Sequence, residues 1–312
     1  MSDFNIEYGV LHRYFGNEKN VLIPDNITKI GDFAFLKCSG ITSIIIPSSV
    51  TSIAKNAFDK CTSLTSIEIP SSVTRIEARA FSNCQSLTSI VIPNGVTHIG
   101  QYAFSSCIRL TNIEIPNSVK YIGESVFESC TSLTNIKIPN SVTAIGGWAF
   151  CDCKCLTHIE IPDSVTKIYN NAFRGCTNLT SIVIPNSVIG IGESAFDNLK
   201  QVKPQYNENG SLRAFKAFRR DWTCRDFKYK VGKSYHQGGF ICCCFNGFHA
   251  CPNPLNVFNY YDGLLEDLRF AEVELSGTRD WETDKVAASD IKIVRELTAT
   301  ELAEIYNSME KV

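Results

Sequence analysis

A proline recurs every 23 residues along the first two thirds of the chain, and this fixed period constrains the fold more than any other feature of the sequence. The prolines are Pro24, Pro47, Pro70, Pro93, Pro116, Pro139, Pro162 and Pro185. Phenylalanine keeps the same period at Phe35, Phe58, Phe81, Phe104, Phe127, Phe150, Phe173 and Phe196. Cysteine does so at Cys38, Cys61, Cys84, Cys107, Cys130, Cys153 and Cys176. A fixed period of about 20–50 residues indicates a solenoid, in which each repeat is one coil stacked on the previous coil.

The apolar residues within one coil predict a strand. Leu64, Ile67 and Ile69 have the L-x-x-L-x-L spacing of a leucine-rich repeat. Ile67 and Ile69 are two residues apart, so they lie on one face of a strand, while Glu68 lies on the other. Pro70 ends the strand because it has no N–H to offer to a hydrogen-bonded ladder. Stacked strands lie about 4.8 Å apart, so equivalent residues of successive coils form continuous buried columns.

The full repeat resembles a known family. The segment from Ile115 to Pro139 reads IPNSVKYIGESVFESCTSLTNIKIP, and it resembles the BspA-type (Treponema-type) leucine-rich repeat. The resemblance covers about residues 4–199 and implies a repeat fold that recognises partners through its surface, without catalysis. We therefore expect residues 1–199 to form an α/β leucine-rich repeat solenoid of about eight 23-residue coils with a parallel strand ladder.

The period fails after Phe196, and a second domain is expected beyond it. Residues 200–211 are polar, which is typical of a linker. Residues 212–312 contain short alternating runs separated by glycine, and Thr298 with Glu301 predicts a capping box at the start of a final helix. We expect a small α+β domain here.

The segment GFHACPNPL at residues 247–255 is similar to an uncharacterised domain of phage and bacterial proteins. The similarity runs over most of residues 212–297 and carries no established chemistry. The interpretation that we favour is that His249 and the neighbouring cysteines pack in the core at the end of a strand.

Three chemical alternatives remain open for this segment. A zinc site would use Cys242, Cys244, His249 and Cys251, which are suitable ligand types, although no Cys-x-x-Cys pair is followed by a second pair at finger spacing. A nucleophilic cysteine would need His236 or His249 as its base.

The third alternative is an ADP-ribosyltransferase. The order of a strand, then GFH before a helix, then AEVE resembles the layout of those enzymes. His249 would then hold nicotinamide adenine dinucleotide (NAD), and Glu272 or Glu274 would orient the ribose. We expect no cofactor, since nothing in the sequence favours these alternatives over packing in the core.

The positions that vary between coils are the candidates for partner binding. On the exposed side of the predicted strands these are Glu68, Glu114, Lys137, His158 and Glu160, which form a polar face of mixed sign. Aromatic residues gather in coils four to seven, at positions expected outside the strand, and aromatic side chains often anchor interfaces. They are Tyr102, Tyr121, Trp148 and Tyr169.

Composition restricts the partners and the compartment. The net charge of −2 gives no attraction to nucleic acid, and the absence of a long apolar run argues against membrane insertion. The N-terminus lacks a basic-then-apolar signal pattern, so we expect a cytoplasmic protein. Seven of the 14 cysteines lie in a column expected to be buried, so we expect reduced thiols. We also expect a monomer.

The function predicted from the sequence is a non-enzymatic recognition scaffold. The array would bind a protein or glycan partner, and the C-terminal domain would cap the array or act as an effector. The alternative is a two-part enzyme, in which the repeats bind the target and the C-terminal domain catalyses a reaction, with ADP-ribosyl transfer as the candidate.

Overall fold

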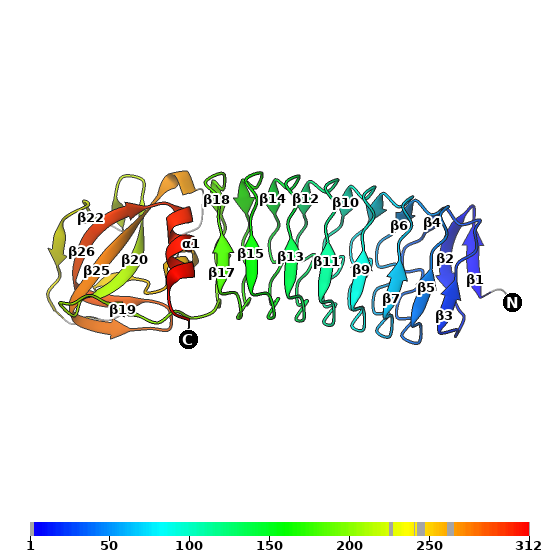
Figure 1. The fold of residues 1–312 in the computed structure, drawn as a ribbon, viewed down its shortest axis with the longest axis horizontal. Coiled ribbons are helices and arrows are strands. Elements are labelled where there is room, and N and C mark those ends of the chain that lie inside the picture. The colour runs from blue at the N-terminus through cyan, green and yellow to red at the C-terminus, as the bar shows by residue number, and fades with distance from the viewer. Residues whose placement is uncertain (1–2, 225–226, 240, 242–246, 261–264, 312) are drawn as a thin grey trace.

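The computed structural model describes residues 3–224, 227–239, 241, 247–260 and 265–311. The molecule is a straight rod, in which stacked coils lead from an N-terminal hairpin to a C-terminal domain (Figure 1). The parallel ladder and the stack of about eight coils, which the 23-residue period predicted, are confirmed.

The first side of the rod carries one three-residue strand per coil. Equivalent residues of neighbouring coils pair in parallel, as Ile113 does with Ile90 and Ile136. The strands are β3 (Asn20–Leu22), β5 (Ser43–Ile45), β7 (Ser66–Glu68), β9 (Ser89–Val91), β11 (Asn112–Glu114), β13 (Asn135–Lys137), β15 (His158–Glu160) and β17 (Ser181–Val183). We call these strands the first ladder, and its pairing is interrupted between β13 and β15.

A second side carries another parallel ladder, which the sequence did not predict because its strands are too short to show alternation. Hairpin β1 (Phe4–Glu7) and β2 (Val10–Tyr14) starts it. The two-residue strands are β4 (Lys29–Ile30), β6 (Ser52–Ile53), β8 (Arg75–Ile76), β10 (His98–Ile99), β12 (Tyr121–Ile122), β14 (Ala144–Ile145), β16 (Lys167–Ile168) and β18 (Gly190–Ile191). This second ladder stops at β10 and resumes at β12.

The third side consists of tight turns, and residues 3–199 contain no helix. Each coil has two residues there in the left-handed region, such as Asn56 (φ 57°) and Lys60 (φ 63°). Left-handed backbone is costly for residues with a side chain, so neighbouring turns must hold it in place. They do so through backbone hydrogen bonds, such as the 2.8 Å bond from Phe58 N to Ala80 O.

The core of the array is a continuous stack of the phenylalanine column. All eight rings are fully buried, and seven ring-to-ring contacts have centroid separations of 5.1–5.8 Å. The cysteine column lies beside it, and each buried thiol donates to a backbone carbonyl, as Cys107 Sγ does to Phe81 O at 3.2 Å. All 11 described cysteines are free thiols.

The C-terminal domain is an antiparallel sheet in the order β19-β20-β25-β26-β23, with β24 also paired to β26. Its long strands β25 and β26 agree with the alternating runs in the sequence. The elements are β19 (Gln205–Tyr206), β20 (Leu212–Arg219), β21 (Thr223–Cys224), β22 (Phe227–Lys228), β23 (Ser234–His236), β24 (Phe248–Ala250), η1 (Pro254–Asn259), η2 (Leu265–Asp267), β25 (Leu268–Trp281), β26 (Val286–Leu297) and α1 (Ala299–Ser308).

Helix α1 lies between this sheet and the last coil, where it covers the end of the array (Figure 1). The predicted capping box of Thr298 and Glu301 is present at its start. Tyr306 is fully buried, and its hydroxyl donates to Leu179 O at 2.6 Å. Phe258 of η1 extends the phenylalanine stack, 5.8 Å from Phe196. The array and its C-terminal cover therefore share one hydrophobic core.

The segment 200–211, expected as a linker, also contacts the C-terminal domain. Lys203 N donates to Glu310 O at 2.8 Å, and β19 within the segment pairs with β20. The segment is therefore packed against the C-terminal domain by hydrogen bonds.

Candidate binding site on the second ladder

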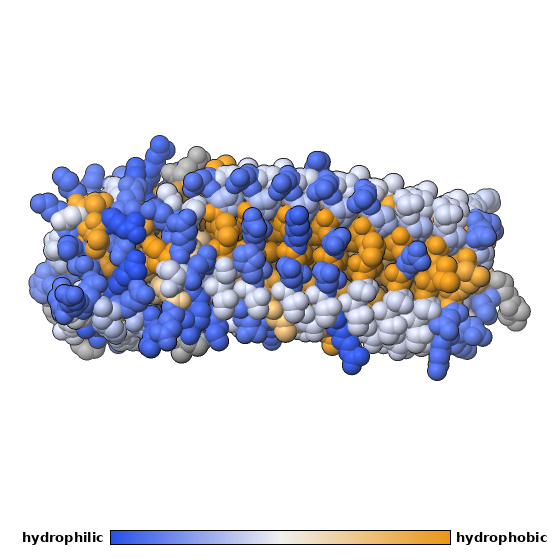
Figure 2. All heavy atoms as spheres, in the orientation of Figure 1, coloured by the Kyte–Doolittle hydropathy of each residue, from blue (hydrophilic) through white to orange (hydrophobic). Residues whose placement is uncertain are grey.

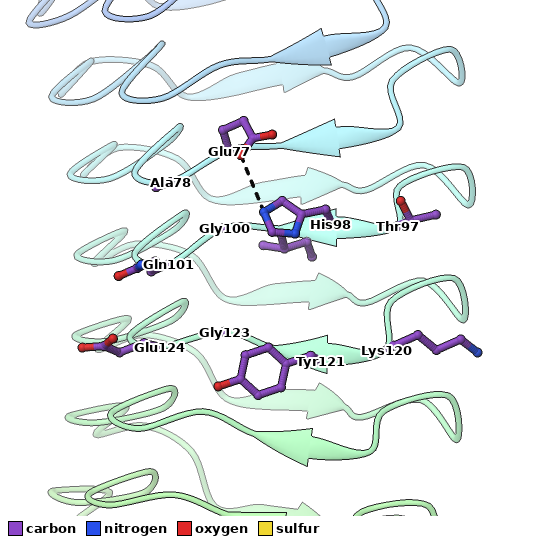
Figure 3. Close-up of a pocket in the computed structure, with 11 residues that line it drawn as sticks. Glu77, Ala78, Thr97, His98, Gly100, Gln101, Lys120, Tyr121, Gly123 and Glu124 are labelled. Carbon is purple, nitrogen blue, oxygen red and sulfur yellow. Dashed lines mark ion pairs between the residues drawn. The ribbon is translucent and has the colours of Figure 1, made fainter.

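A groove of about 480 Å³ crosses the second ladder at β10 and β12 (Figure 3). Its walls carry an aromatic ring, an imidazole, an amide, a hydroxyl and charged groups of both signs. They come from Glu77, Thr97, His98, Gln101, Lys120, Tyr121 and Glu124. Concave sites with one aromatic surface and a few convergent polar groups are typical of ligand binding.

Glycines at one repeating position form the floor of the groove, and the close stacking of the coils explains them. A Cβ on Gly100 would lie 2.4 Å from Ala78 N, so no other residue fits there without a backbone shift. Gly123 has more room, since its nearest contact would be Val126 Cγ2 at 3.3 Å. With no side chains on these glycines, the surface above them is hollow.

Ion pairs and hydrogen bonds, both within one coil and between neighbouring coils, hold the polar walls. Arg75 Nε lies 2.7 Å from Glu77 Oε1, and the other oxygen of Glu77 lies 3.6 Å from His98 Nε2. The Tyr102 hydroxyl donates to Glu124 Oε1 at 3.4 Å. These contacts fix the direction of both carboxylates before any ligand arrives.

Tyr121 is the aromatic surface of the groove and is 45% exposed. Its ring lies flat over the ladder, with one face turned toward the viewer in Figure 3. Partial burial, and then the nearby Tyr169 and Glu124, raise the pKa of its hydroxyl. The hydroxyl therefore stays protonated at neutral pH and can donate a hydrogen bond.

The aromatic residues predicted from the sequence lie on two sides of the rod. Tyr121 lies on β12, which corrects the expectation that it stands outside the strands. Tyr102 and Trp148 occupy left-handed turn positions (φ 58° and 59°). Arginines cover both rings, with Arg79 4.5 Å from the Tyr102 centroid and Arg174 5.5 Å from that of Trp148.

The charged residues predicted for binding lie along the first ladder, apart from the groove. All five are exposed: Glu68, Glu114, Lys137, His158 and Glu160. Figure 2 shows this side, where hydrophilic side chains stand out from an apolar band. Leu22, Ile45 and Val91 are 67%, 58% and 76% exposed, so the N-terminal half of the face is largely apolar, with Glu68 between Ile45 and Val91.

The groove residues Glu77, His98, Gln101 and Glu124 were missed in the sequence. His98, Gln101 and Glu124 belong to columns that vary between coils, whereas Glu77 occupies the position of Gly100 one coil earlier. This largely glycine column is the signal that could have located the groove. Locating the groove from the sequence would also have required a prediction of the second ladder, on which the groove lies.

The acidic candidates of the C-terminal domain make ion pairs within its sheet. Glu272 lies 2.7 Å from Arg213 Nε and 3.1 Å from Arg295 Nε. Burial disfavours the charged form of Glu272, but the hydrogen bonds and charges of the two arginines outweigh burial and lower its pKa. Glu274 lies 3.2 Å from Lys292 Nζ.

A cleft of about 380 Å³ contains Glu274 but not His249 among its lining residues. Its histidine is His236, whose Nδ1 lies 2.7 Å from Asp290 Oδ1. His249 lies on β24, and its backbone carbonyl accepts from Lys216 Nζ at 2.7 Å.

Two of the zinc candidates, Cys242 and Cys244, lie outside the described residues. Cys251 is buried, and burial raises its thiol pKa. Within the ranges that the structure describes, no three His, Cys, Asp or Glu side chains are grouped to hold a metal ion.

Comparison with known families identifies the array. The BspA type leucine rich repeat region, in six copies, matches residues 11–130 and 97–219. The chain belongs to this family. Beyond the BspA-type array, residues 212–305 match a domain of unknown function (DUF7666). A search of curated proteins found no match.

Three solved structures are similar to this BspA-type protein. A leucine-rich repeat protein from Bacteroides ovatus is 32% identical over 62% of this chain and 66% of that chain, with a TM-score of 0.39. The T. pallidum leucine rich repeat protein is 27% identical over 49% of this chain and 86% of that chain, with a TM-score of 0.41. A leucine rich cell surface protein from Faecalibacterium prausnitzii is 24% identical over 62% and 90%, with a TM-score of 0.29. This chain thus spans under two thirds of the Bacteroides ovatus protein.

No helix in the described ranges has both the length and the apolar character needed to cross a bilayer.

Proposed function

We propose that this BspA-type protein is a non-catalytic recognition scaffold, whose array binds a protein or glycan partner and whose C-terminal domain caps the array. The groove at β10 and β12 carries the proposal, because it presents an exposed Tyr121 between ordered polar groups on stacked coils. Rigid, preorganised surfaces bind with little loss of conformational entropy.

The capping role is supported by the contacts of α1. The Asn307 side chain pairs with the backbone of Ile182 on β17, the final strand of the first ladder. The Thr300 hydroxyl donates to Ile184 O at 2.7 Å. Terminal repeats of a solenoid need a cover for their apolar end. A domain used in this way has a structural reason to follow the array, whether or not it has a further activity.

The enzymatic alternative has less support. ADP-ribosyl transfer by the predicted residues needs His249 and one acid in a single cleft, whereas the cleft of Glu274 is lined by His236. Glu272 is engaged by Arg213 and Arg295. These placements favour a structural role for both acids.

We also propose that the protein works in a reducing compartment such as the cytoplasm. Burial keeps the column thiols protonated, and it raises the pKa of Cys107 to about 12. Such thiols suit a compartment where disulfides are rare.

The test is partner capture by the full-length protein and two matched variants. Extract from the native host is passed over wild type, over a groove variant (Tyr121→Ala) and over a first-ladder variant (Lys137→Ala). We expect one partner that is captured by wild type and the first-ladder variant but lost by the groove variant. NAD consumption that is abolished by Glu272→Gln or Glu274→Gln would overturn the scaffold proposal.

A further inference from the structure

We propose that the groove at β10 and β12 binds a neutral oligosaccharide, with one pyranose ring stacked on Tyr121. This inference rests on the recognition function proposed above and names the chemical class of the partner. Four observations carry it: the exposed ring face, the fixed polar walls, the closed seam between the two strands, and the balance of charge.

The ring of Tyr121 is a platform for a sugar. It is 45% exposed and lies flat over the ladder (Figure 3). One face of a pyranose consists of C–H groups, which carry partial positive charge and pack on the negative face of an aromatic ring. A flat ring facing solvent is suited to this contact, whereas a ring packed on edge would offer only its rim.

The polar walls match the hydroxyl groups of a sugar. Each hydroxyl both donates and accepts, so a site needs acceptors and donors in alternation. The carboxylates of Glu77 and Glu124 accept, while Gln101 and His98 can do either. Because Arg75 holds Glu77 at 2.7 Å and Tyr102 holds Glu124 at 3.4 Å, the acceptors are already oriented.

The seam between β10 and β12 excludes an added peptide strand. The pairing of the second ladder is interrupted there, yet a Cβ on Gly123 would lie only 3.4 Å from Ile99 O, so the two coils remain closely stacked. The Phe104 and Phe127 rings beneath the seam are 5.8 Å apart, against 5.1–5.6 Å for most of the column. A further strand would need about 4.8 Å on each of its sides, so the seam is too narrow for one.

The groove carries no net charge, which favours an uncharged ligand. Arg75 pairs with Glu77, while Lys120 and Glu124 place one charge of each sign at opposite ends of the groove (Figure 3). From Glu77 to Tyr121 the groove crosses three coils, a distance of about 10 Å at the spacing of stacked strands. Two linked pyranose rings fit along this length.

The experiment is calorimetric titration of the full-length protein with cellotriose, maltotriose and mannotriose, and with sialyllactose as the anionic probe. We expect at least one neutral trisaccharide to bind and sialyllactose to bind more weakly. Tyr121→Ala should weaken binding about tenfold. Tyr121→Phe keeps the ring and should stay within about threefold of wild type.

The control is Tyr206→Ala, which removes an exposed tyrosine of the C-terminal domain and should leave binding unchanged. Circular dichroism of each variant shows whether the array is folded. Failure of all three trisaccharides to bind at millimolar concentration overturns the glycan inference, as does binding that Tyr121→Ala leaves intact. If a protein partner from the capture experiment still depends on Tyr121, the scaffold proposal survives that failure. If neither depends on Tyr121, both proposals fail.

Discussion

The side chain of Asn307 pairs with the backbone of Ile182 as a neighbouring strand would. Ile182 N donates to Asn307 Oδ1 at 2.8 Å, and Asn307 Nδ2 donates to Ile182 O at 2.7 Å. A carboxamide carries the same donor and acceptor as a peptide group. This one residue therefore closes the edge of the first ladder at β17, where another coil would otherwise be needed.

Replacement of Asn307 by alanine should destabilise the protein. Both backbone groups of Ile182 would lose their partner, at a cost of about 1–3 kcal/mol in the free energy of unfolding. Asn307→Asp should cost at least as much, because a carboxylate oxygen would face Ile182 O. Urea denaturation measures both changes, with Ser308→Ala as the control on the exposed side of α1. A loss below about 0.5 kcal/mol would show that the pair does not close the ladder.

Truncation of Phe104 to alanine should cost about 3–5 kcal/mol in the free energy of unfolding, because it leaves a cavity in a fully buried stack. The loss should spread to neighbouring coils, since each repeat is stabilised by its neighbours. Phe104→Leu fills part of the cavity and should cost less. The measurement is urea denaturation, with hydrogen exchange to locate the loosened coils. A change below about 1 kcal/mol would mean that the column is not core.

The buried columns could be predicted from the sequence because the 23-residue period repeats each residue in the same environment. Phe104 and Cys107 illustrate this, since both are fully buried as their columns indicated. The second ladder could not be predicted, because a two-residue strand such as Tyr121–Ile122 has no alternation to detect. The groove was missed with it.

The contacts that join distant parts of the chain were also beyond the sequence. Helix α1 was predicted from its capping box, but the backbone partner of Asn307 lies 125 residues away in the sequence. A polar residue on a short helix ordinarily faces solvent, so nothing in the local pattern marks it as a ladder cap. The ion pairs of Glu272 could not be predicted either, because Arg213 and Arg295 are distant from it in the sequence.

The buried cysteines should make the protein less stable at alkaline pH. Burial raises the pKa of Cys107 to about 12, above the value of about 8.5 for an unfolded thiol. The folded state therefore holds its proton where the unfolded state loses it. This contribution is complete below pH ~8.5 and is lost as pH rises toward the folded pKa, by about 1.4 kcal/mol per pH unit for each thiol.

Urea denaturation between neutral and alkaline pH measures this loss. Cys107→Ala should show a shallower alkaline fall than wild type, whereas Cys155→Ala, which removes an exposed thiol, should match wild type. Native alkylation should modify Cys155 and spare Cys107. Disulfides linking Cys61, Cys84, Cys107 and Cys130, found by counting thiols under denaturing and non-reducing conditions, would contradict both the reduced column and the cytoplasmic proposal.

Glu272 should stabilise the C-terminal domain at neutral pH and lose that effect in acid. Its folded pKa is lowered, since Arg213 and Arg295 outweigh the effect of burial. The stabilisation is therefore present above the unfolded pKa of about 4.3 and is lost as pH falls through the lower folded value. Glu272→Gln should cost about 1–2 kcal/mol in the free energy of unfolding at pH ~7 and make the acid limb of the stability profile shallower. Urea denaturation at several pH values measures both effects, and Glu304→Gln on α1 is the control. Full stability in Glu272→Gln would mean that the carboxylate is not needed for the fold, and would revive the interpretation of Glu272 as a catalytic acid.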